Sequence, residues 1–250
     1  MTESIRRIGI LTKRNLKEIL RDPLSLTFTI ALPLLLEVLF YAIFHKMTAQ
    51  FEMRYLAPGI VVFSQAFLTL FTGILISQDR NTAFLTRLYV SRARSYEFIF
   101  GYVCALLPIA LVQSVLFFLV GGILEPSIFS VGMIWGCLVS LVTALFYIGA
   151  GILVGSIANE QAVGGMASIV ITGQSILSGM WFPVEGLGKG VTVAMKCLPF
   201  KNATLLVQNC FLGVTDAASD FWIPLAVVLA YTAAVTVWAI LAFRKKMKGE

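Results

Sequence analysis

The amino-acid sequence predicts an all-α integral membrane protein with six transmembrane helices. Two compositional observations support this prediction: 58% of the 250 residues are hydrophobic and only 13% are charged, whereas soluble domains carry about 25% charged residues. The third is that the apolar residues gather into six runs close to the roughly 20 residues that a helix needs to cross a bilayer. A soluble fold of this size has too little interior to hide so much apolar surface.

Residues 1–23 predict an amphipathic helix at the membrane surface rather than a span. Apolar and basic residues occupy opposite halves of its helical wheel. The apolar half holds Ile5, Ile8, Leu11, Leu16, Ile19 and Leu20, and the basic half holds Arg6, Arg7, Lys13, Arg14, Lys17 and Arg21. Pro23 ends this helix, because proline lacks the N–H that a continuing helix requires.

The predicted spans form one transmembrane domain over residues 1–250. They cover residues 25–44, 60–77, 98–124, 131–158, 163–181 and 221–243. The fourth span contains the small-residue pairs Gly132-x-x-x-Gly136 and Gly151-x-x-x-Gly155, which allow helices to approach closely. Ordinary packing within the chain is favoured for them over a seam between two chains.

The segment at 79–96, which joins the second and third spans, is rich in basic residues. Phe84, Leu85, Leu88 and Tyr89 can form one face of a short helix, with Arg80 and Arg87 elsewhere on it. A solvated basic loop explains the charge equally well. The segment is therefore either a compact helix that contacts a partner, or a linker that makes no such contact.

The segment at 182–220, between the fifth and sixth spans, is unusually apolar for a loop. It predicts two short helices broken near Pro199, partly embedded in the outer leaflet, because non-helical backbone at that depth must be shielded by protein. Cys197 and Cys210 lie on either side of Pro199. They either form a disulfide at an oxidising surface or remain free thiols in apolar surroundings.

Charge asymmetry predicts that both termini are cytoplasmic, because cytoplasmic loops of membrane proteins carry an excess of Lys and Arg. The segments assigned to the inner side hold Arg6, Arg7, Lys13, Arg14, Lys17, Arg21, Arg80, Arg87, Arg92, Arg94, Arg244, Lys245, Lys246 and Lys248; the outer ones hold only Lys46, Arg54, Lys189, Lys196 and Lys201. The net charge of +6 therefore indicates a lipid bilayer as partner. Nucleic acid is disfavoured, because the basic clusters directly flank apolar runs.

The sequence predicts no catalytic, metal or ATP site in this chain. Zinc needs several closely spaced ligands, whereas His45 is the single histidine and no Cys pair has CxxC spacing. The phosphate-binding pattern G-x-x-x-x-G-K-[ST] is absent: Gly188-Lys189 is followed by Gly190, and Pro183 stands where the pattern needs its first glycine.

The layout resembles the permease subunits of the ABC type-2 exporter family. The resemblance rests on the basic amphipathic N-terminal helix, the stretch QDRNTAFLTRLYVSRARSYEFIFG after the second span, the tight turn Asn159-Glu160-Gln161, and the two prolines of Phe182-Pro183 and Leu198-Pro199-Phe200. It covers essentially the whole chain. The family's Leu-Pro segment is usually followed by a helix that contains Tyr, whereas PFKNATLLVQN has none.

The resemblance implies a multi-pass plasma-membrane subunit of an exporter whose substrate belongs to the lipid, drug, peptide or polysaccharide class. A separate cytoplasmic ABC ATPase would bind ATP and Mg, and a second permease copy or paralogue would complete the transporter. The segment at 79–96 is the expected ATPase contact, with Phe84, Leu85, Leu88 and Tyr89 as its anchors and Arg80 and Arg87 at the rim.

Four polar residues inside the spans are candidates for the substrate path. Glu37, Gln65, Gln113 and Gln174 come out at similar depths when counted at about 1.5 Å per residue, so they can form one polar layer. Either this layer binds a polar part of the substrate, or Glu37 is protonated or hydrogen-bonded to a neighbouring Gln and only holds helices together.

Two other functions remain open. A secondary transporter would need several intramembrane acids or histidines for ion coupling, and Glu37 is the single acid well inside a span. A membrane partner of an ATPase that serves assembly or immunity, without transport, is also compatible with the sequence.

Overall fold

The computed structural model describes residues 2–81, 95–181, 188–213 and 216–247, and all the regular structure in these ranges is helical. The helices are α1 (Thr2–Ile19), α2 (Pro23–Phe44), α3 (Met53–Asn81), α5 (Ser95–Leu124), α6 (Val131–Ile157), α7 (Glu160–Leu177), α8 (Lys189–Cys197), α9 (Pro199–Leu212) and α10 (Ile223–Met247). Short helical turns lie at Ala49–Phe51 (η1), Pro126–Ile128 (η2) and Ala218–Trp222 (η3). The all-α prediction is therefore confirmed.

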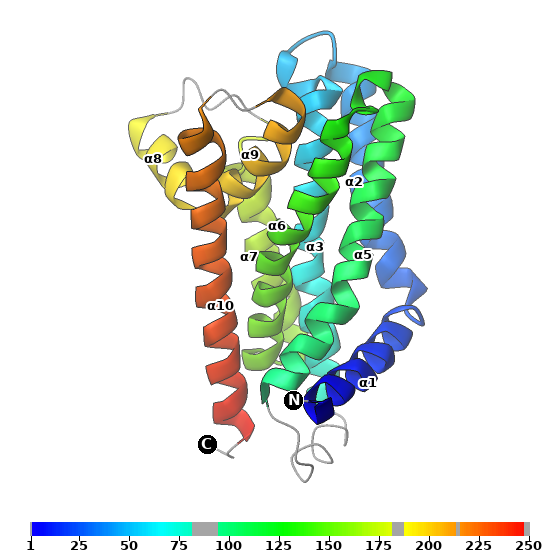
Figure 1. Cartoon of the computed structure of the whole chain (residues 1–250), viewed down its shortest axis with the longest axis vertical. Coiled ribbons are helices and arrows are strands. Elements are labelled where there is room, and N and C mark those ends of the chain that lie inside the picture. The colour runs from blue at the N-terminus through cyan, green and yellow to red at the C-terminus, as the bar shows by residue number, and fades with distance from the viewer. Residues whose placement is uncertain (1, 82–94, 182–187, 214–215, 248–250) are drawn as a thin grey trace.

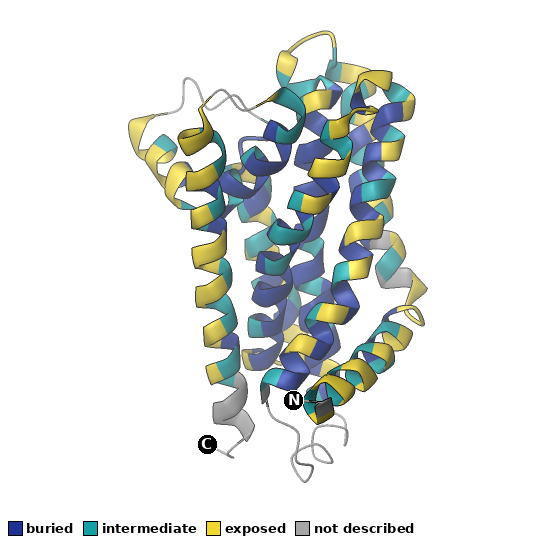
Figure 2. Cartoon of the chain, viewed as in Figure 1, coloured by how far each residue is buried: buried dark blue, intermediate teal, exposed yellow. Residues whose placement is uncertain are grey.

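The long helices stand side by side in one bundle (Figure 1). We call the end that carries both termini, α1 and the start of α5 the basal end, and the opposite end, with η1, η2 and α8, the distal end. Helix α3 is the most central of the long helices, whereas α10 lies at the periphery and is largely exposed (Figure 2). Apolar side chains exposed along the bundle, such as Leu35, Trp135 and Trp238, match a lipid-facing surface.

Four of the described helices are long and apolar enough to cross a membrane: Met53–Arg80, Tyr96–Leu124, Val131–Ile157 and Ala218–Ala242. Helices α2 and α7 run beside them, but their described residues are not long and apolar enough to count as membrane-crossing helices by the same criterion. The described apolar stretch of α2 is only Thr29–Phe44. In α7, glycine and glutamine residues among the apolar ones lower the mean hydropathy. The count of six spans thus stays a prediction for these two helices.

The helix boundaries differ from the prediction where polar residues extend a span. Helix α3 begins seven residues before the predicted Ile60 and continues to Asn81, because helical hydrogen bonding does not stop where hydropathy falls. Pro23 is the first residue of α2, a position where its missing N–H leaves no intrahelical bond unmade.

The glycine pairs of α6 pack within the chain, as predicted. A Cβ at Gly155 would lie 2.7 Å from the carbonyl oxygen of Gly73 in α3, and one at Gly151 would lie 2.7 Å from that of Thr69. A Cβ at Gly136 would lie 3.0 Å from the ring of Phe211 in α9. Helix α6 therefore meets α3 through backbone contact.

Gly155→Ala should lower the free energy of unfolding by about 1–3 kcal/mol, the usual cost of overpacking. The obstacle is the backbone of Gly73, which cannot turn aside as a side chain can. Gly164→Ala in α7 is the matched control, because a Cβ there meets nothing within 4 Å. Thermal unfolding of both purified variants measures the difference, and equal midpoints would contradict this packing argument.

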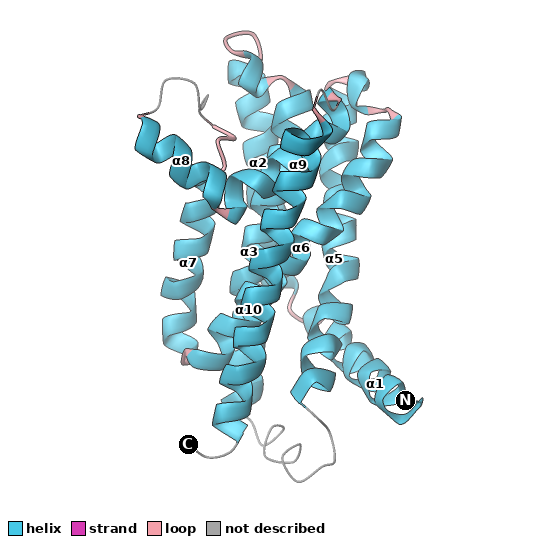
Figure 3. Cartoon of the chain, turned by 60° about the vertical axis from the view of Figure 1, so that its left-hand side comes forward, coloured by secondary structure: helices cyan, strands magenta, loops and turns pink. Residues whose placement is uncertain are grey.

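The segment after α7 forms two short helices, as predicted, and Leu198 separates α8 from α9 (Figure 3). Helix α9 is held inside the bundle by polar contacts: Gln208 Nε2 donates to the carbonyl of Tyr55 at 2.9 Å, and Asn209 Nδ2 to that of Asp220 at 2.8 Å. Protein therefore shields α9, as the argument from its apolar sequence required.

Cys197 and Cys210 are free thiols, so the structure does not contain the disulfide that was one of the two alternatives. Cys197 ends α8, whereas Cys210 lies near the far end of α9. Helix rise of about 1.5 Å per residue separates them by more than the roughly 7 Å between Cα atoms that a disulfide tolerates. Burial raises the pKa of Cys210 to about 11, which keeps this thiol protonated and unreactive at neutral pH.

Candidate functional site

The predicted ATPase-contact segment is described only at its two edges. Arg80 lies in the last turn of α3, whereas Phe84, Leu85, Arg87, Leu88 and Tyr89 lie outside the described residues. The structure therefore shows the frame from which this segment leaves and to which it returns. That frame is built from α1 and the basal ends of α3, α5, α6 and α7.

Asp79 ties three helices together at the basal end. Its carboxylate, 4% exposed, accepts hydrogen bonds from both terminal nitrogens of Arg14 in α1, at 2.5 Å for Nη1···Oδ2. It also accepts one from the hydroxyl of Tyr102 in α5. Such a two-point contact between a guanidinium and a carboxylate fixes orientation as well as charge, so we name these three residues the Asp79 triad.

The charge of the triad is nearly balanced within the protein. Burial alone would lower the pKa of Arg14, but the hydrogen bond and the charge of Asp79 outweigh it, so this pKa is raised and Arg14 stays charged. Glu18 also contacts Arg14, at 2.5 Å. Burial, and then repulsion from Asp79, raise the pKa of Glu18.

Further contacts hold α1 against α5. Arg7 Nη1 lies 3.6 Å from Glu97 Oε2, whose side chain is 1% exposed. The hydroxyls of Ser4 and Tyr96 are 3.4 Å apart, and Leu11 packs so closely on Gly101 that a Cβ there would lie 2.8 Å away. Helix α1 is thus bound to the bundle along its length, which its amphipathic pattern alone did not predict.

Arg80 follows Asp79 in α3 but contacts α6 rather than α1. Its Nη1 donates to the carbonyls of Gly155, Ser156 and Ala158, at 2.7, 2.9 and 3.0 Å. These carbonyls end α6 and have no further turn to bond, and a cation also suits the negative end of a helix dipole. Its predicted place at the rim of an ATPase contact stays a prediction.

The turn between α6 and α7 belongs to the same frame. Asn159 caps α7, with Oδ1 accepting from the N–H of Ala162 at 2.9 Å. Gln78 Nε2, one residue before Asp79, donates to Glu160 Oε1 at 3.2 Å. Three consecutive residues of α3, at 78–80, therefore contact α7, α1 and α6.

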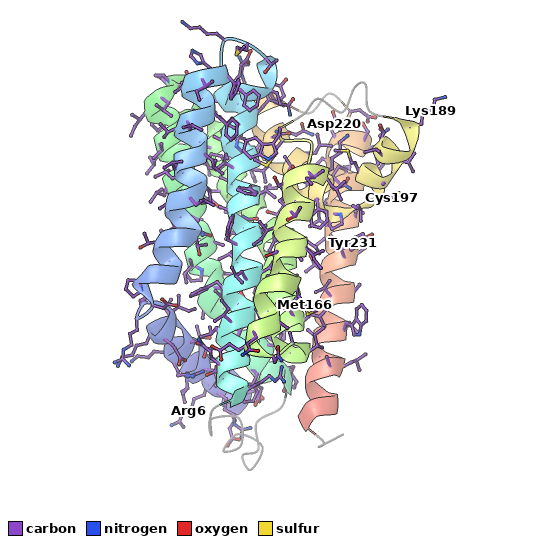
Figure 4. The ribbon with its side chains drawn as sticks, turned by 180° about the vertical axis from the view of Figure 1, so that it is seen from behind. Arg6, Met166, Lys189, Cys197, Asp220 and Tyr231 are labelled. Carbon is purple, nitrogen blue, oxygen red and sulfur yellow. The ribbon has the colours of Figure 1, made fainter. Side chains whose placement is uncertain are left out.

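An open hollow of about 620 Å³ lies along α1. The described residues that line it are Ile10, Lys13, Arg14, Lys17, Glu18 and Arg21. Figure 4 shows this end from behind, with Arg6 at the base and Lys189 and Cys197 at the distal end. The basal surface is thus strongly basic, although Asp79 and Glu97 beneath it are acidic.

The four candidate path residues are all fully buried, and two of them, Gln65 and Gln174, make hydrogen bonds to different residues. Gln65 bonds to α6, donating to the Ser140 carbonyl at 2.8 Å and accepting from Thr143 at 2.7 Å. Gln174 accepts from Tyr147 at 2.6 Å and donates to Thr204 at 3.0 Å.

Glu37 and Gln113 differ from the two glutamines, because their side-chain polar atoms have no hydrogen-bond partner among the described residues. No described hydrogen bond joins any two of the four. The hydrogen-bonded pair of Glu37 with a neighbouring Gln, one form of the structural alternative, is therefore absent from the described residues.

Two comparisons with known proteins bear on this chain. The family model described as ABC-2 type transporter matches residues 6–212, from the first turns of α1 to the end of α9. A search of curated proteins finds no significant match.

Proposed function

The chain belongs to the ABC-2 type transporter family, and we propose that it is the membrane subunit of an exporter driven by a separate cytoplasmic ATPase. The family match over residues 6–212 carries this proposal, because the matched region includes the helices from α1 to α9 and with them the basal frame. ATP and Mg would bind to the ATPase. A second permease copy or paralogue would complete the transporter in the plasma membrane.

The basal end is the proposed cytoplasmic side. Both termini lie there, and most Lys and Arg residues outside the spans fall in segments at that end. Helix α3 ends at Asn81 and α5 begins at Ser95, both at that end. In this proposal, the ATPase therefore contacts the basal end between these two residues.

The frame around this segment suits a mechanical coupling role. A push on the end of α3 would be shared at once with α1 through the Asp79 triad and with α6 through Arg80. Coupling between distant sites needs such rigid elements joined by specific contacts. In this proposal Phe84, Leu85, Leu88 and Tyr89 supply the buried anchors of the contact, which usually carry most of the binding energy.

The substrate path remains part of the proposal. Gln65 and Gln174 are already hydrogen-bonded within the bundle, so a substrate would meet them only after the helices move. Substrate-stimulated ATPase activity is the assay that separates lipid, drug, peptide and polysaccharide substrates.

Leu88→Asp should abolish capture of the ATPase while leaving membrane insertion intact. A charge at a buried apolar anchor costs desolvation that rim contacts do not offset. The tagged chain is purified from its own cells, and the accompanying ATPase is measured by mass spectrometry and by ATP hydrolysis. Thr48→Asp, at an exposed distal position, is the control.

The two possible failures of this experiment differ in meaning. If no ATPase accompanies the unmodified chain, the proposed function is wrong. If Leu88→Asp captures the ATPase as well as the unmodified chain does, the function stands and the segment at 79–96 is a linker.

A further inference from the structure

Glu37 is buried in an apolar contact between three helices. Its side chain in α2 is 0% exposed, and neither carboxyl oxygen has a hydrogen-bond partner among the described residues. A Cβ placed on Gly121 of α5 would lie 3.1 Å from Glu37 Oε1, 3.2 Å from Ala57 Cβ and 3.3 Å from Met53 Cγ. The carboxyl group therefore sits in tight packing against α3 and α5.

This setting excludes most ligands of a carboxylate. Gly121 approaches Glu37 so closely that an added methyl group would be crowded there. An ionised carboxylate without a paired cation is strongly disfavoured in such surroundings, whereas the neutral acid is tolerated. A proton is the ligand that both the packing and the electrostatics of this conformation accept.

A line of polar groups leads from Glu37 toward the distal end. Tyr41 and His45 follow Glu37 at intervals of one helical turn on the same face of α2, and their rings stack at 4.6 Å. The Tyr41 hydroxyl donates to the carbonyl of Leu124 at 3.5 Å. Leu124 lies one turn beyond Gly121 on α5, so Glu37 and Tyr41 meet the same end of α5, although no described hydrogen bond joins their side chains.

His45 is oriented to take up a proton at the distal surface. Its Nδ1 lies 2.7 Å from the carbonyl oxygen of Tyr41. A carbonyl only accepts hydrogen bonds, so Nδ1 carries the hydrogen and Nε2 is left as the basic nitrogen. His45 and Tyr41 are both half-buried, between the surface and Glu37.

We propose that Glu37 is a proton-binding site that exchanges with the distal side through His45 and Tyr41, and that the bound proton allows α2 to pack against α3 and α5. In uptake, His45 Nε2 accepts a proton from water. The Tyr41 hydroxyl then leaves the Leu124 carbonyl, accepts a proton from His45 and releases its own to the Glu37 carboxylate. This step requires a local movement, because no described hydrogen bond joins the three side chains. The two relay groups end as they began, and Glu37 gains one proton. The inference does not depend on the ATPase.

The charged groups near this route are few in the described residues. Just after α5, Glu125 accepts from the Met53 N–H at 3.3 Å. Glu125 follows Leu124, whose carbonyl accepts from the Tyr41 hydroxyl, and Lys46 directly follows His45. At the start of α3, Glu52 and Arg54 pair at 3.9 Å and are about half exposed. Toward Glu37 itself, α3 and α5 present Met53, Ala57 and Gly121, which do not titrate.

Infrared spectroscopy of the purified chain in lipid nanodiscs tests the proposal. The unmodified chain should show a protonated-carboxyl C=O band at neutral pH that is missing in Glu37→Gln. Glu97→Gln should retain the band, because Glu97 is equally buried but lies 3.6 Å from Arg7. A band that is absent from the unmodified chain, or that survives in Glu37→Gln, overturns the site.

The route is tested by transferring the same samples into D₂O. Tyr41→Phe and His45→Gln should each slow the deuterium shift of the band at least tenfold, whereas Glu52→Gln should leave its rate unchanged. Equal rates in all four proteins would overturn the route. Thermal unfolding of each variant checks that α2 is still packed.

Discussion

Asp79→Asn should lower the free energy of unfolding by about 3 kcal/mol, the low end for breaking a buried ion pair. The low end applies because Arg14 is 29% exposed and keeps Glu18 as a partner. The amide retains the shape of the carboxylate, but its N–H₂ group replaces one acceptor oxygen with a donor. Two guanidinium nitrogens and one hydroxyl donate hydrogen bonds at this site, so one acceptor is lost. Thermal or denaturant unfolding in detergent measures this loss.

The variant should also release α1 from α5. Ser4 and Tyr96 lie near each other, at 3.4 Å between hydroxyls, so a Ser4→Cys and Tyr96→Cys pair joined by a short bifunctional thiol reagent reports this contact by its crosslinking yield. The yield should fall several-fold when Asp79→Asn is added. An unchanged yield would show that the apolar contact of Leu11 with Gly101 suffices to hold α1.

Glu3→Gln is the matched control. Glu3 also pairs with an arginine of α1, at 3.1 Å from Arg7, but its side chain is 87% exposed. Exposed pairs contribute about 0–1 kcal/mol, so this variant should unfold almost as the unmodified chain does. Combining Arg14→Met with Asp79→Leu should recover part of the lost stability, because no uncompensated charge remains buried.

The sequence identified the helices of the bundle because apolar runs and proline positions act locally. The break before Pro199 and the packing role of Gly151 and Gly155 were predicted correctly for this reason. Periodicity could not predict which helix α1 would contact. Arg14 and Asp79 are 65 residues apart, and their pairing depends on the arrangement of three helices.

The polar residues illustrate the same limit. Counting depth along each span places Glu37, Gln65, Gln113 and Gln174 near one level, but depth does not specify which way a side chain points. Gln174 turns toward Tyr147 and Thr204, and Gln65 toward Ser140 and Thr143. Hydroxyl groups at Thr143, Tyr147 and Thr204 were the available signal, because buried amides need such partners.

The resemblance placed Arg80 at the rim of an ATPase contact, and that role stays a prediction. Its guanidinium also completes the end of α6, where Gly155, Ser156 and Ala158 are buried. Water cannot easily replace a donor at buried carbonyls, so removing this side chain leaves acceptors unsatisfied.

Arg80→Ala should therefore destabilise the fold by about 3 kcal/mol or more, since each hydrogen bond to a charged group contributes about 1.5–3 kcal/mol and the three share one nitrogen. Arg80→Lys should lose less stability than Arg80→Ala, because the lysine ammonium keeps the positive charge. Some loss should remain, because the ammonium lacks the planar guanidinium group. Unfolding midpoints together with ATPase capture separate the two roles of Arg80. If Arg80 acts only at the ATPase rim, Arg80→Ala should reduce ATPase capture and leave the unfolding midpoint unchanged. If Arg80 completes the end of α6, the same variant should lower the unfolding midpoint. The double variant Asp79→Asn with Arg80→Ala should lose less free energy of unfolding than the sum of the two single losses. Both residues anchor the same end of α3, and neighbouring residues of this kind do not act independently.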